Sequence, residues 1–203
     1  MANVFEFVAE ARSATGSSAA KVIRRQGKVP AVMYGGSAAP EMLVLDHNEL
    51  LKQLAHEAVY SHVLDVKVDG RTEKAVLKHI HRHPAKPQIL HVDFLRVDES
   101  HKLKVHVPLH FINEATSVGV KKGGVVGHVM TDVEITCMPS ALPEYIEVDM
   151  AGVDVGGIVH LSDLVLPAGI EIPVLQQGAE HDHPVVQIAK PKGGEAVSEE
   201  AED

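Results

Sequence analysis

A regular alternation of apolar and polar positions in the second half of the chain restricts its fold more than any other feature. Within residues 103–111 every odd position is apolar, and the positions between them are lysine, histidine or proline. Successive side chains of a strand point to opposite faces, so this pattern predicts a β-strand with one buried face. Aromatic residues make up only 3% of the chain and tryptophan is absent. The core is therefore expected to consist mainly of Val, Leu and Ile, and the β-branched members of that set favour strands.

Shorter patterns predict a mixed first half and a more purely β second half. In the first half Gly27 is expected to end one helix, while Ser18 and Asp46 are expected to begin the two helices as caps. The Asp69-Gly70 dipeptide predicts a tight hairpin turn. The first half is thus expected to be a small β-rich barrel or sheet carrying two helices. The predicted strands cover 5–11, 30–34, 42–45, 63–68, 72–82, 89–97, 103–111, 125–136, 145–150 and 184–189, and the predicted helices cover 19–26 and 47–56.

The charge is divided unevenly along the chain. Residues 1–98 hold 13 Lys/Arg and 11 Asp/Glu, whereas residues 99–203 hold 6 and 17, so the formal charges are +2 and −11. Such asymmetry indicates that the two halves have different roles. We therefore predict a first domain over residues 1–98, a C-terminal β domain over residues 99–189 and a disordered acidic tail over residues 190–203.

A basic segment near the N-terminus is the first candidate binding site. Five cations fall within residues 11–34, which contain no acidic residue, and a loop of small hydroxyl residues that includes Ser17 precedes most of them. Val22 and Ile23 are expected to turn partly inward on the predicted helix. Cations of this kind displace counterions from RNA, so binding should weaken steeply with salt. The alternative is a solvated helix face without a ligand. The five cations are Arg12, Lys21, Arg24, Arg25 and Lys28.

Histidines between residues 79 and 93 leave a second alternative open. His79, His81 and His83 would share one face of a strand, about 6.6 Å apart in successive pairs. Three imidazoles in a row cannot easily converge on one ion, so a zinc site would have to borrow His91 and Asp93. A metal-dependent hydrolase is therefore the alternative function, although no CxxC, HExxH or GxSxG motif is present. It would use His79, His81, His91 and Asp93. Metal analysis of the purified protein would discriminate.

The same region also fits an RNA site. Asp93 can accept a hydrogen bond from the amino group of cytosine, and His91 can contact a phosphate or a 2′-hydroxyl. Tyr34, which ends a predicted strand beside two glycines, can stack on a base or ribose.

Other features limit the location of the protein. No run of 18 apolar residues exists, and the first residues lack the basic and apolar regions of a secretory signal. The single cysteine, Cys137, cannot form an internal disulfide and fits a reducing cytoplasm. We therefore expect a cytoplasmic protein with no membrane partner.

Three segments of the first half resemble a known family. They are the run RRQGKVPAVMYG from Arg24 to Gly35, HRHP from His81 to Pro84, and HVDF from His91 to Phe94, and they occur in this order at the separations seen in the bacterial large-subunit ribosomal protein number twenty-five family. That family includes the longer general stress protein CTC. The resemblance covers the whole chain, because short members end near residue 97 and long members carry a second β domain.

The resemblance implies a mainly β (α+β) fold with an N-terminal β-barrel carrying two helices and a C-terminal β-rich domain. It also implies a structural, non-enzymatic component of the large subunit that binds 5S ribosomal RNA at its loop E region without a cofactor or metal. The C-terminal domain is expected to contact another ribosomal protein or solvent. A stress-related protein-binding module acting mainly through the acidic half is the third possibility, which sedimentation with or without ribosomes would discriminate.

The family's RNA contacts map onto matching positions of this chain, with three departures. Ala20-Lys21-Val22 lacks a hydroxyl and one cation that many members have, and Ser17 stands where Lys or Gly is frequent. His81 replaces the glutamine of a Gln-x-His-Pro motif. The matching contact positions are Arg12, Lys21, Arg24, Tyr34, His91 and Asp93, and the full predicted RNA-binding set adds Ser17, Arg25, Lys28 and His81.

Overall fold

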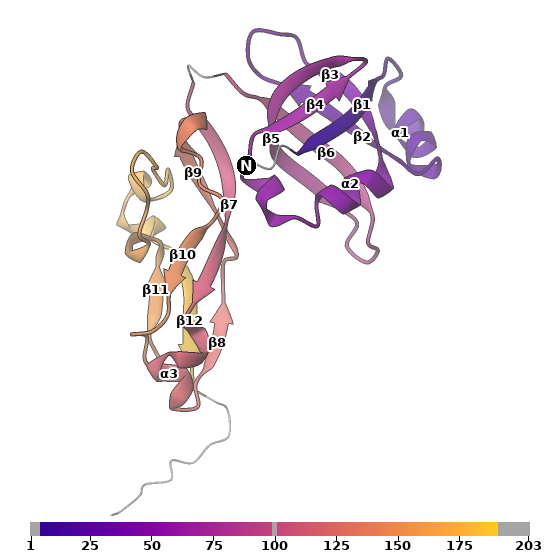
Figure 1. The fold of residues 1–203 in the computed structure, drawn as a ribbon. Helices are drawn as coiled ribbons and strands as arrows, with labels where there is room; N and C mark the ends of the chain where they lie inside the picture. The colour runs from indigo at the N-terminus through magenta and orange to yellow at the C-terminus, as the bar shows by residue number, and fades with distance from the viewer. Residues whose placement is uncertain (1–4, 99–100, 191–203) are drawn as a thin grey trace, which may run out of the picture.

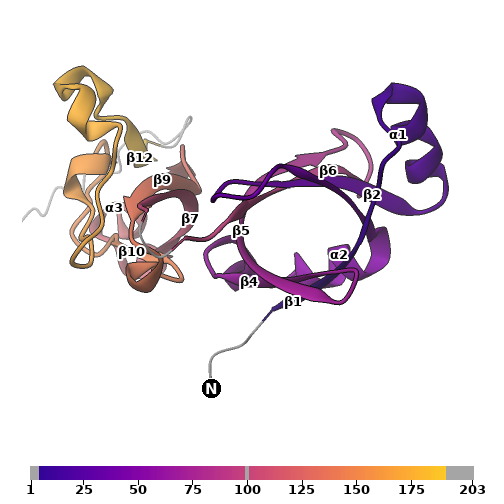
Figure 2. The same ribbon diagram turned by 90° about the horizontal axis from the view of Figure 1, so that it is seen from above.

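The first half of the chain forms a closed six-stranded β-barrel in the computed structural model, which describes residues 5–98 and 101–190. The strand order around the barrel is β1-β3-β2-β6-β5-β4, with β1 and β4 closing it through a parallel pair (Figures 1 and 2). Closure leaves none of the six described strands with an unpaired edge. The strands are β1 (Glu6–Ala11), β2 (Lys28–Tyr34), β3 (Glu41–Asp46), β4 (Leu64–Val68), β5 (Arg71–Arg82) and β6 (Ile89–Arg96).

Aliphatic side chains from all six strands fill the barrel, as the low aromatic content predicts. Met33, Leu43 and Val66 are almost fully buried. Phe7 and Phe94 form an aromatic pair within this core, with ring centroids 5.8 Å apart.

Helix α1 (Gly16–Arg25) begins earlier than the sequence predicts and contains no buried residue. The prediction that Ser18 caps it is wrong, because Gly16, with a φ of +88°, already turns the chain into the helix. Val22 does not turn inward either, since it is 51% exposed, whereas Ala19 and Ile23 are half-buried. Gly27 follows the helix with a positive φ, and its N–H donates to the Arg24 carbonyl, as predicted.

Two local predictions in the first half are confirmed. The Asp46 carboxylate accepts hydrogen bonds from the backbone N–H groups of Asn48 and Glu49, at 2.8 and 3.1 Å, and so caps helix α2 (His47–Gln53). That helix is shorter than predicted, and a 3₁₀ turn (Glu57–Tyr60) follows it. Asp69 and Gly70 both adopt positive φ in the turn that joins β4 to β5.

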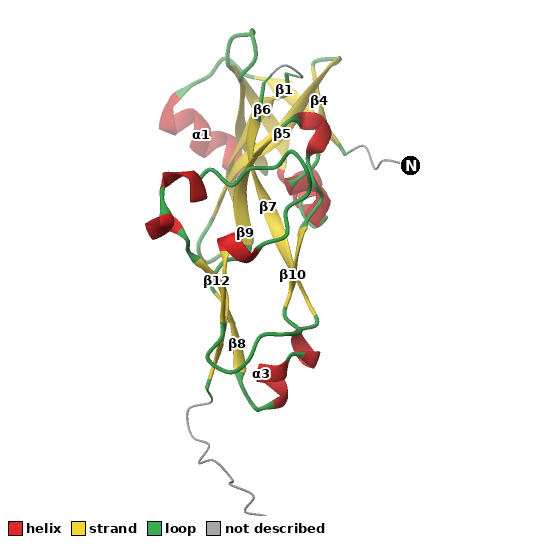
Figure 3. Cartoon of the chain, turned by 90° about the vertical axis from the view of Figure 1, so that its left-hand side faces the viewer, coloured by secondary structure: helices red, strands yellow, loops and turns green. Residues whose placement is uncertain are grey.

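The second domain consists of two three-stranded sheets, ordered β10-β7-β9 and β11-β12-β8 (Figures 1 and 3). The alternation over residues 103–111 is confirmed, because Leu103, Val105, Val107 and Leu109 are buried and the residues between them are not. The strands are β7 (Leu103–Ile112), β8 (Val125–His128), β9 (Asp132–Cys137), β10 (Ile146–Asp149), β11 (Ile158–His160) and β12 (Pro184–Ala189). Helix α3 spans Val118–Lys121, and 3₁₀ turns span Glu114–Thr116, Pro139–Ala141, Leu161–Asp163, Leu175–Gln177 and Ala179–His181.

The prediction of one strand over residues 125–136 is wrong. The segment divides into β8 and β9, which belong to different sheets. The backbone N–H groups of Val129 and Met130 both donate to the Val185 carbonyl, at 2.9 and 3.1 Å, and this irregular pairing marks where the chain leaves one sheet. Strand β11 and helix α3 were not predicted. The predicted acidic tail lies outside the described residues, apart from its first position, Lys190.

The two domains contact each other along β5 and β7. Val76 of the barrel packs with Leu103 and Val105 in a small apolar cluster. The Lys78 ammonium group donates to the Lys104 carbonyl at 3.0 Å and to the Glu134 carboxylate at 3.1 Å. No helix within residues 5–98 and 101–190 is long and apolar enough to cross a membrane.

Candidate nucleic-acid interface

The outward side of strands β2, β6 and β5 carries a group of polar side chains that we call the polar face. Residues paired in register point to the same side of a sheet. Asp93 is in register with His79 and His91 with His81, and Tyr34 shares the outward side of β2 with Val32, the parallel partner of Asp93. The alternate residues of β6, Val92 and Phe94, are buried in the barrel. The polar face therefore comprises Tyr34, His79, His81, His91 and Asp93.

Within this face His91 and Asp93 form a direct pair. The Nδ1 atom of His91 lies 2.7 Å from Oδ1 of Asp93, and both side chains are about one-third exposed, at 30% and 28%. Such a contact fixes the orientation of the imidazole ring. It directs Nε2 and the second carboxylate oxygen to other partners, so the pair can present both a nitrogen and an acceptor oxygen to a ligand.

Tyr34, the last residue of β2, lies at one end of the polar face. Burial is the main cause that raises the pKa of its hydroxyl, and the negative charge of Asp93 raises it further. Tyr34 therefore remains protonated at neutral pH and can donate a hydrogen bond. The next residue, Gly35, has a φ of +98°, and a Cβ there would lie 2.7 Å from Leu95 Cδ1. Only glycine fits this exit from β2.

Helix α1 is attached beside the polar face by Arg24. Its Nε donates to the Leu90 carbonyl at 2.9 Å, one residue before His91. Figure 2 shows the helix outside the barrel wall, next to β2. Lys21 and Arg25 are exposed on the side of the helix away from the barrel, and Ser17 is exposed in its first turn. The two cations closest to solvent thus project from a helix that Arg24 holds in place.

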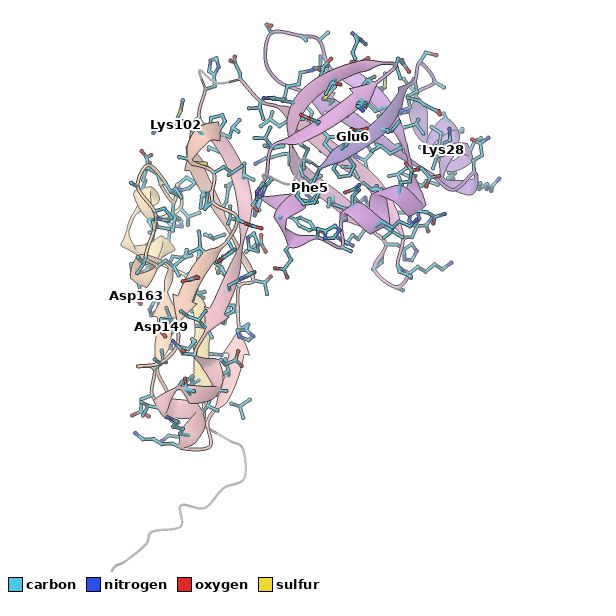
Figure 4. All side chains as sticks on the ribbon, viewed as in Figure 1. Phe5, Glu6, Lys28, Lys102, Asp149 and Asp163 are labelled. Atoms are coloured by element: carbon cyan, nitrogen blue, oxygen red, sulfur yellow. The ribbon has the colours of Figure 1, made fainter. Side chains whose placement is uncertain are left out.

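Two of the cations predicted to bind RNA make contacts with other residues of the same domain. Arg12 donates through Nε to the Leu43 carbonyl at 3.2 Å and through Nη1 to the Ala14 carbonyl at 2.8 Å, which orders the start of the loop before α1. Lys28 lies on β2 rather than on the helix (Figure 4) and pairs with Glu10 at 2.7 Å. The basic segment has no acid of its own, yet β1 supplies one.

The predicted site residues thus fall into three groups. Tyr34, His81, His91 and Asp93 share the polar face, and Arg24 borders it. Ser17, Lys21 and Arg25 lie on α1, whereas Arg12 and Lys28 make contacts within the barrel. His79 also belongs to the polar face, although it was not among the predicted RNA-binding residues. Its signal was its spacing of two residues from His81 on one strand.

The geometry does not support the metal-dependent alternative. The expectation that His83 lies in one row with His79 and His81 is wrong, because β5 ends at Arg82. The His83 ring instead accepts hydrogen bonds from the backbone N–H groups of Ala85 and Lys86, at 3.1 and 3.2 Å. Across the part of the chain that the structure describes, no three His, Cys, Asp or Glu side chains converge as metal ligands.

Comparisons with known proteins match both domains. Residues 7–94 match the Ribosomal L25p family, and residues 102–192 match the C-terminal domain of ribosomal protein TL5. The chain is 57% identical to the large ribosomal subunit protein bL25 of Methylococcus capsulatus over 96% of both chains. It is 54% identical to the protein of the same name from Cellvibrio japonicus over 99% of both chains, and 50% identical to that of Hahella chejuensis over 100% of this chain and 98% of the relative.

Proposed function

The chain belongs to the bL25 family of large ribosomal subunit proteins, and from this premise we propose that its barrel binds 5S ribosomal RNA through the polar face and helix α1. The family is a structural, non-enzymatic one, so the polar face is interpreted as a binding surface. The observation that carries the proposal is the convergence of Tyr34, His91 and Asp93 on one outward face, beside a helix fixed by Arg24.

Each part of the surface has a distinct proposed role. Lys21 and Arg25 neutralise phosphates, because they are exposed on α1. Asp93 accepts from an exocyclic amino group of a base, and His91, oriented by Asp93, contacts a phosphate or a 2′-hydroxyl. Tyr34 stacks on a base or ribose while its hydroxyl remains protonated. His81 offers one ring nitrogen as a donor and the other as an acceptor.

The C-terminal domain is proposed to face other partners. The formal charge of −11 over residues 99–203 is repelled by a phosphate backbone, so broad RNA contact through this half is unfavourable. We assign residues 1–98 to the RNA-binding domain, residues 99–189 to the C-terminal domain and residues 190–203 to an acidic tail. The protein is proposed to act in the cytoplasm as part of the ribosome.

Binding of the full chain to 5S ribosomal RNA tests this function. Affinity is measured between about 50 and 200 mM salt, against a duplex RNA of equal length, for the wild type and for Arg24→Ala and Asp93→Asn. Lys67→Ala is the matched control, because Lys67 is an exposed cation on β4 paired with Glu6, outside the polar face. Selective binding that both interface variants weaken and the control retains supports the proposal. Equal affinity for both RNAs, or full binding by both interface variants, contradicts it.

A further inference from the structure

The outward side of the sheet β11-β12-β8 carries uncharged residues, whereas the outward side of the other described sheet of this domain carries charged ones. Ile158, Gln187 and Gly127 lie in register across the three strands, and Val125 and Ala189 form the next row of the same face. We call these five residues the uncharged face. Their neighbours on β12, Val186 and Ile188, point the other way into the core.

The uncharged face is open to solvent although its side chains are largely apolar. Val125 is 59% exposed and Ile158 is 46% exposed, and Gln187 between them is exposed as well. Gly127, on the outer strand β8, adds no side chain beside Gln187. Single exposed apolar residues are common on protein surfaces, but here Ile158 and Val125 lie on the two outer strands on either side of Gln187 and Ala189, and no member of the face carries a charge.

We propose that the uncharged face is a docking surface for an uncharged, apolar surface of a neighbouring protein in the large ribosomal subunit. This proposal rests on the proposed function, because binding of the barrel to RNA would anchor the chain to the subunit. It assigns the C-terminal domain a protein partner and specifies which side of that domain the partner covers.

Charge decides between RNA and protein as the occupant. RNA affinity depends on cations that displace counterions, and the five positions supply none. Of the exposed cations nearest along the chain, Lys122 is paired with Asp154 at 2.6 Å, and Lys121 and Lys190 lie outside the five positions. Contact with an uncharged protein surface is favourable, because apolar groups on both surfaces lose contact with water and no charge is left unpaired.

Size decides between a ribosomal neighbour and a second copy of this chain. A stable complex in solution buries roughly 1,200–2,000 Å² in total, with about 20–30 residues on each side. Five residues are far below that requirement, so the face cannot hold a dimer by itself. A small contact is sufficient when another part of the molecule is already anchored, because the second contact then forms at a high effective concentration. The RNA-bound barrel provides that anchor.

The test places a charge on the face and measures retention of the full chain on purified large subunits that lack this protein. The double variant Val125→Glu, Ile158→Glu is expected to dissociate about tenfold faster than the wild type, because two carboxylates are desolvated against an uncharged partner. Its affinity for free 5S ribosomal RNA is expected to be unchanged, and an unchanged thermal unfolding transition of the C-terminal domain shows that the variant is folded. The matched control is Val165→Glu, since Val165 is 83% exposed in the same domain and outside the face.

A photo-crosslinking residue in place of Gln187 identifies the occupant on the assembled subunit. A crosslink to one ribosomal protein, abolished by the double glutamate variant, supports the proposal. A crosslink only to ribosomal RNA, a crosslink to a second copy of this chain, or no crosslink together with unchanged retention overturns it. Loss of wild-type binding to free 5S ribosomal RNA would instead contradict the proposed function of the barrel, so the two failures are distinguishable.

Discussion

The polar face of the barrel and the uncharged face of the C-terminal domain are both outward sides of three adjacent strands. Beneath them lie similar aliphatic cores, represented by Val92 of β6 and Val186 of β12. The positions between the buried residues differ, because β6 presents His91 and Asp93 where β12 presents Gln187 and Ala189. The buried half of each strand pattern therefore determines the fold, and the exposed half determines which partner each domain suits.

Helix α1 and the C-terminal domain use their cations differently. Arg24 bonds to a backbone carbonyl, so its positive charge is not cancelled by a carboxylate in that contact. In the C-terminal domain Lys102 pairs with Glu171 at 2.8 Å and Lys122 with Asp154 at 2.6 Å. Hydrogen bonds from these lysines are the main cause that lowers the pKa of both carboxyl groups. The C-terminal pairs therefore remain ionised and mutually neutralised, while the basic helix of the first domain keeps charge for a ligand.

The largest effect on this contrast is expected from Arg24→Ala. The substitution removes a cation and leaves the Leu90 carbonyl without its 2.9 Å donor, so α1 is released from β6. We expect the dissociation constant for 5S ribosomal RNA to rise about 10- to 100-fold, measured by filter binding. Arg24→Lys keeps the charge and should lose less. Unchanged binding by Arg24→Ala would show that the position of α1 does not matter for the interface.

Asp93→Asn is expected to reduce selectivity more than charge-driven binding. The amide offers one acceptor in place of a carboxylate and weakens the hold on the His91 ring at 2.7 Å. A base contact of this kind contributes about 1–3 kcal/mol of discrimination, so the preference for 5S ribosomal RNA over a duplex competitor should fall roughly tenfold. Asp65→Asn on β4 is the control, because Asp65 lies outside the polar face. An equal loss of affinity for both RNAs would assign Asp93 a structural role.

Lys21→Ala should have a smaller effect, visible mainly in the salt dependence. An exposed lysine that contacts one phosphate adds about one to the slope of log K against log salt concentration. We expect the slope to decrease by about one and the affinity to fall a few-fold at low salt. Lys122→Ala, in the C-terminal domain, is expected to change neither quantity. The contrast between the domains would fail if the two lysine variants behaved alike.

Local chemistry made several elements predictable from the sequence. The Asp46 cap and the Asp69-Gly70 turn depend on residues adjacent in the chain, and both form as expected. The division of residues 125–136 was not predictable in this way, because Val185, more than 50 residues later, supplies the carbonyl at the crossover. Barrel closure through β1 and β4 likewise depends on pairing between distant segments.

The same distinction applies to the candidate site. The common direction of His91 and Asp93 followed from their spacing of two on a strand, and the 2.7 Å contact agrees with it. The alignment of His79 with Asp93 depends on an irregular register between Leu77 and His79, which spacing alone does not reveal. Lys28 seemed unpaired from the sequence because its partner, Glu10, comes from β1, which β3 separates from β2 in the barrel wall.

The smallest expected effect is a change in the pKa of Tyr34, and it tests whether the charge of Asp93 acts on the Tyr34 hydroxyl. Because burial is the main cause of the raised pKa and Asp93 the second, Asp93→Asn should lower the pKa of Tyr34 only partly toward its ordinary value. Absorbance titration of tyrosinate in the wild type and the variant measures this shift. An unfolded tyrosine ionises near pH 10, whereas folded Tyr34 retains its proton to higher pH, so the free energy of unfolding should decrease as pH rises through that window. The decrease should be smaller in Asp93→Asn, and an identical tyrosinate titration in both proteins would show that Asp93 and Tyr34 are electrostatically independent.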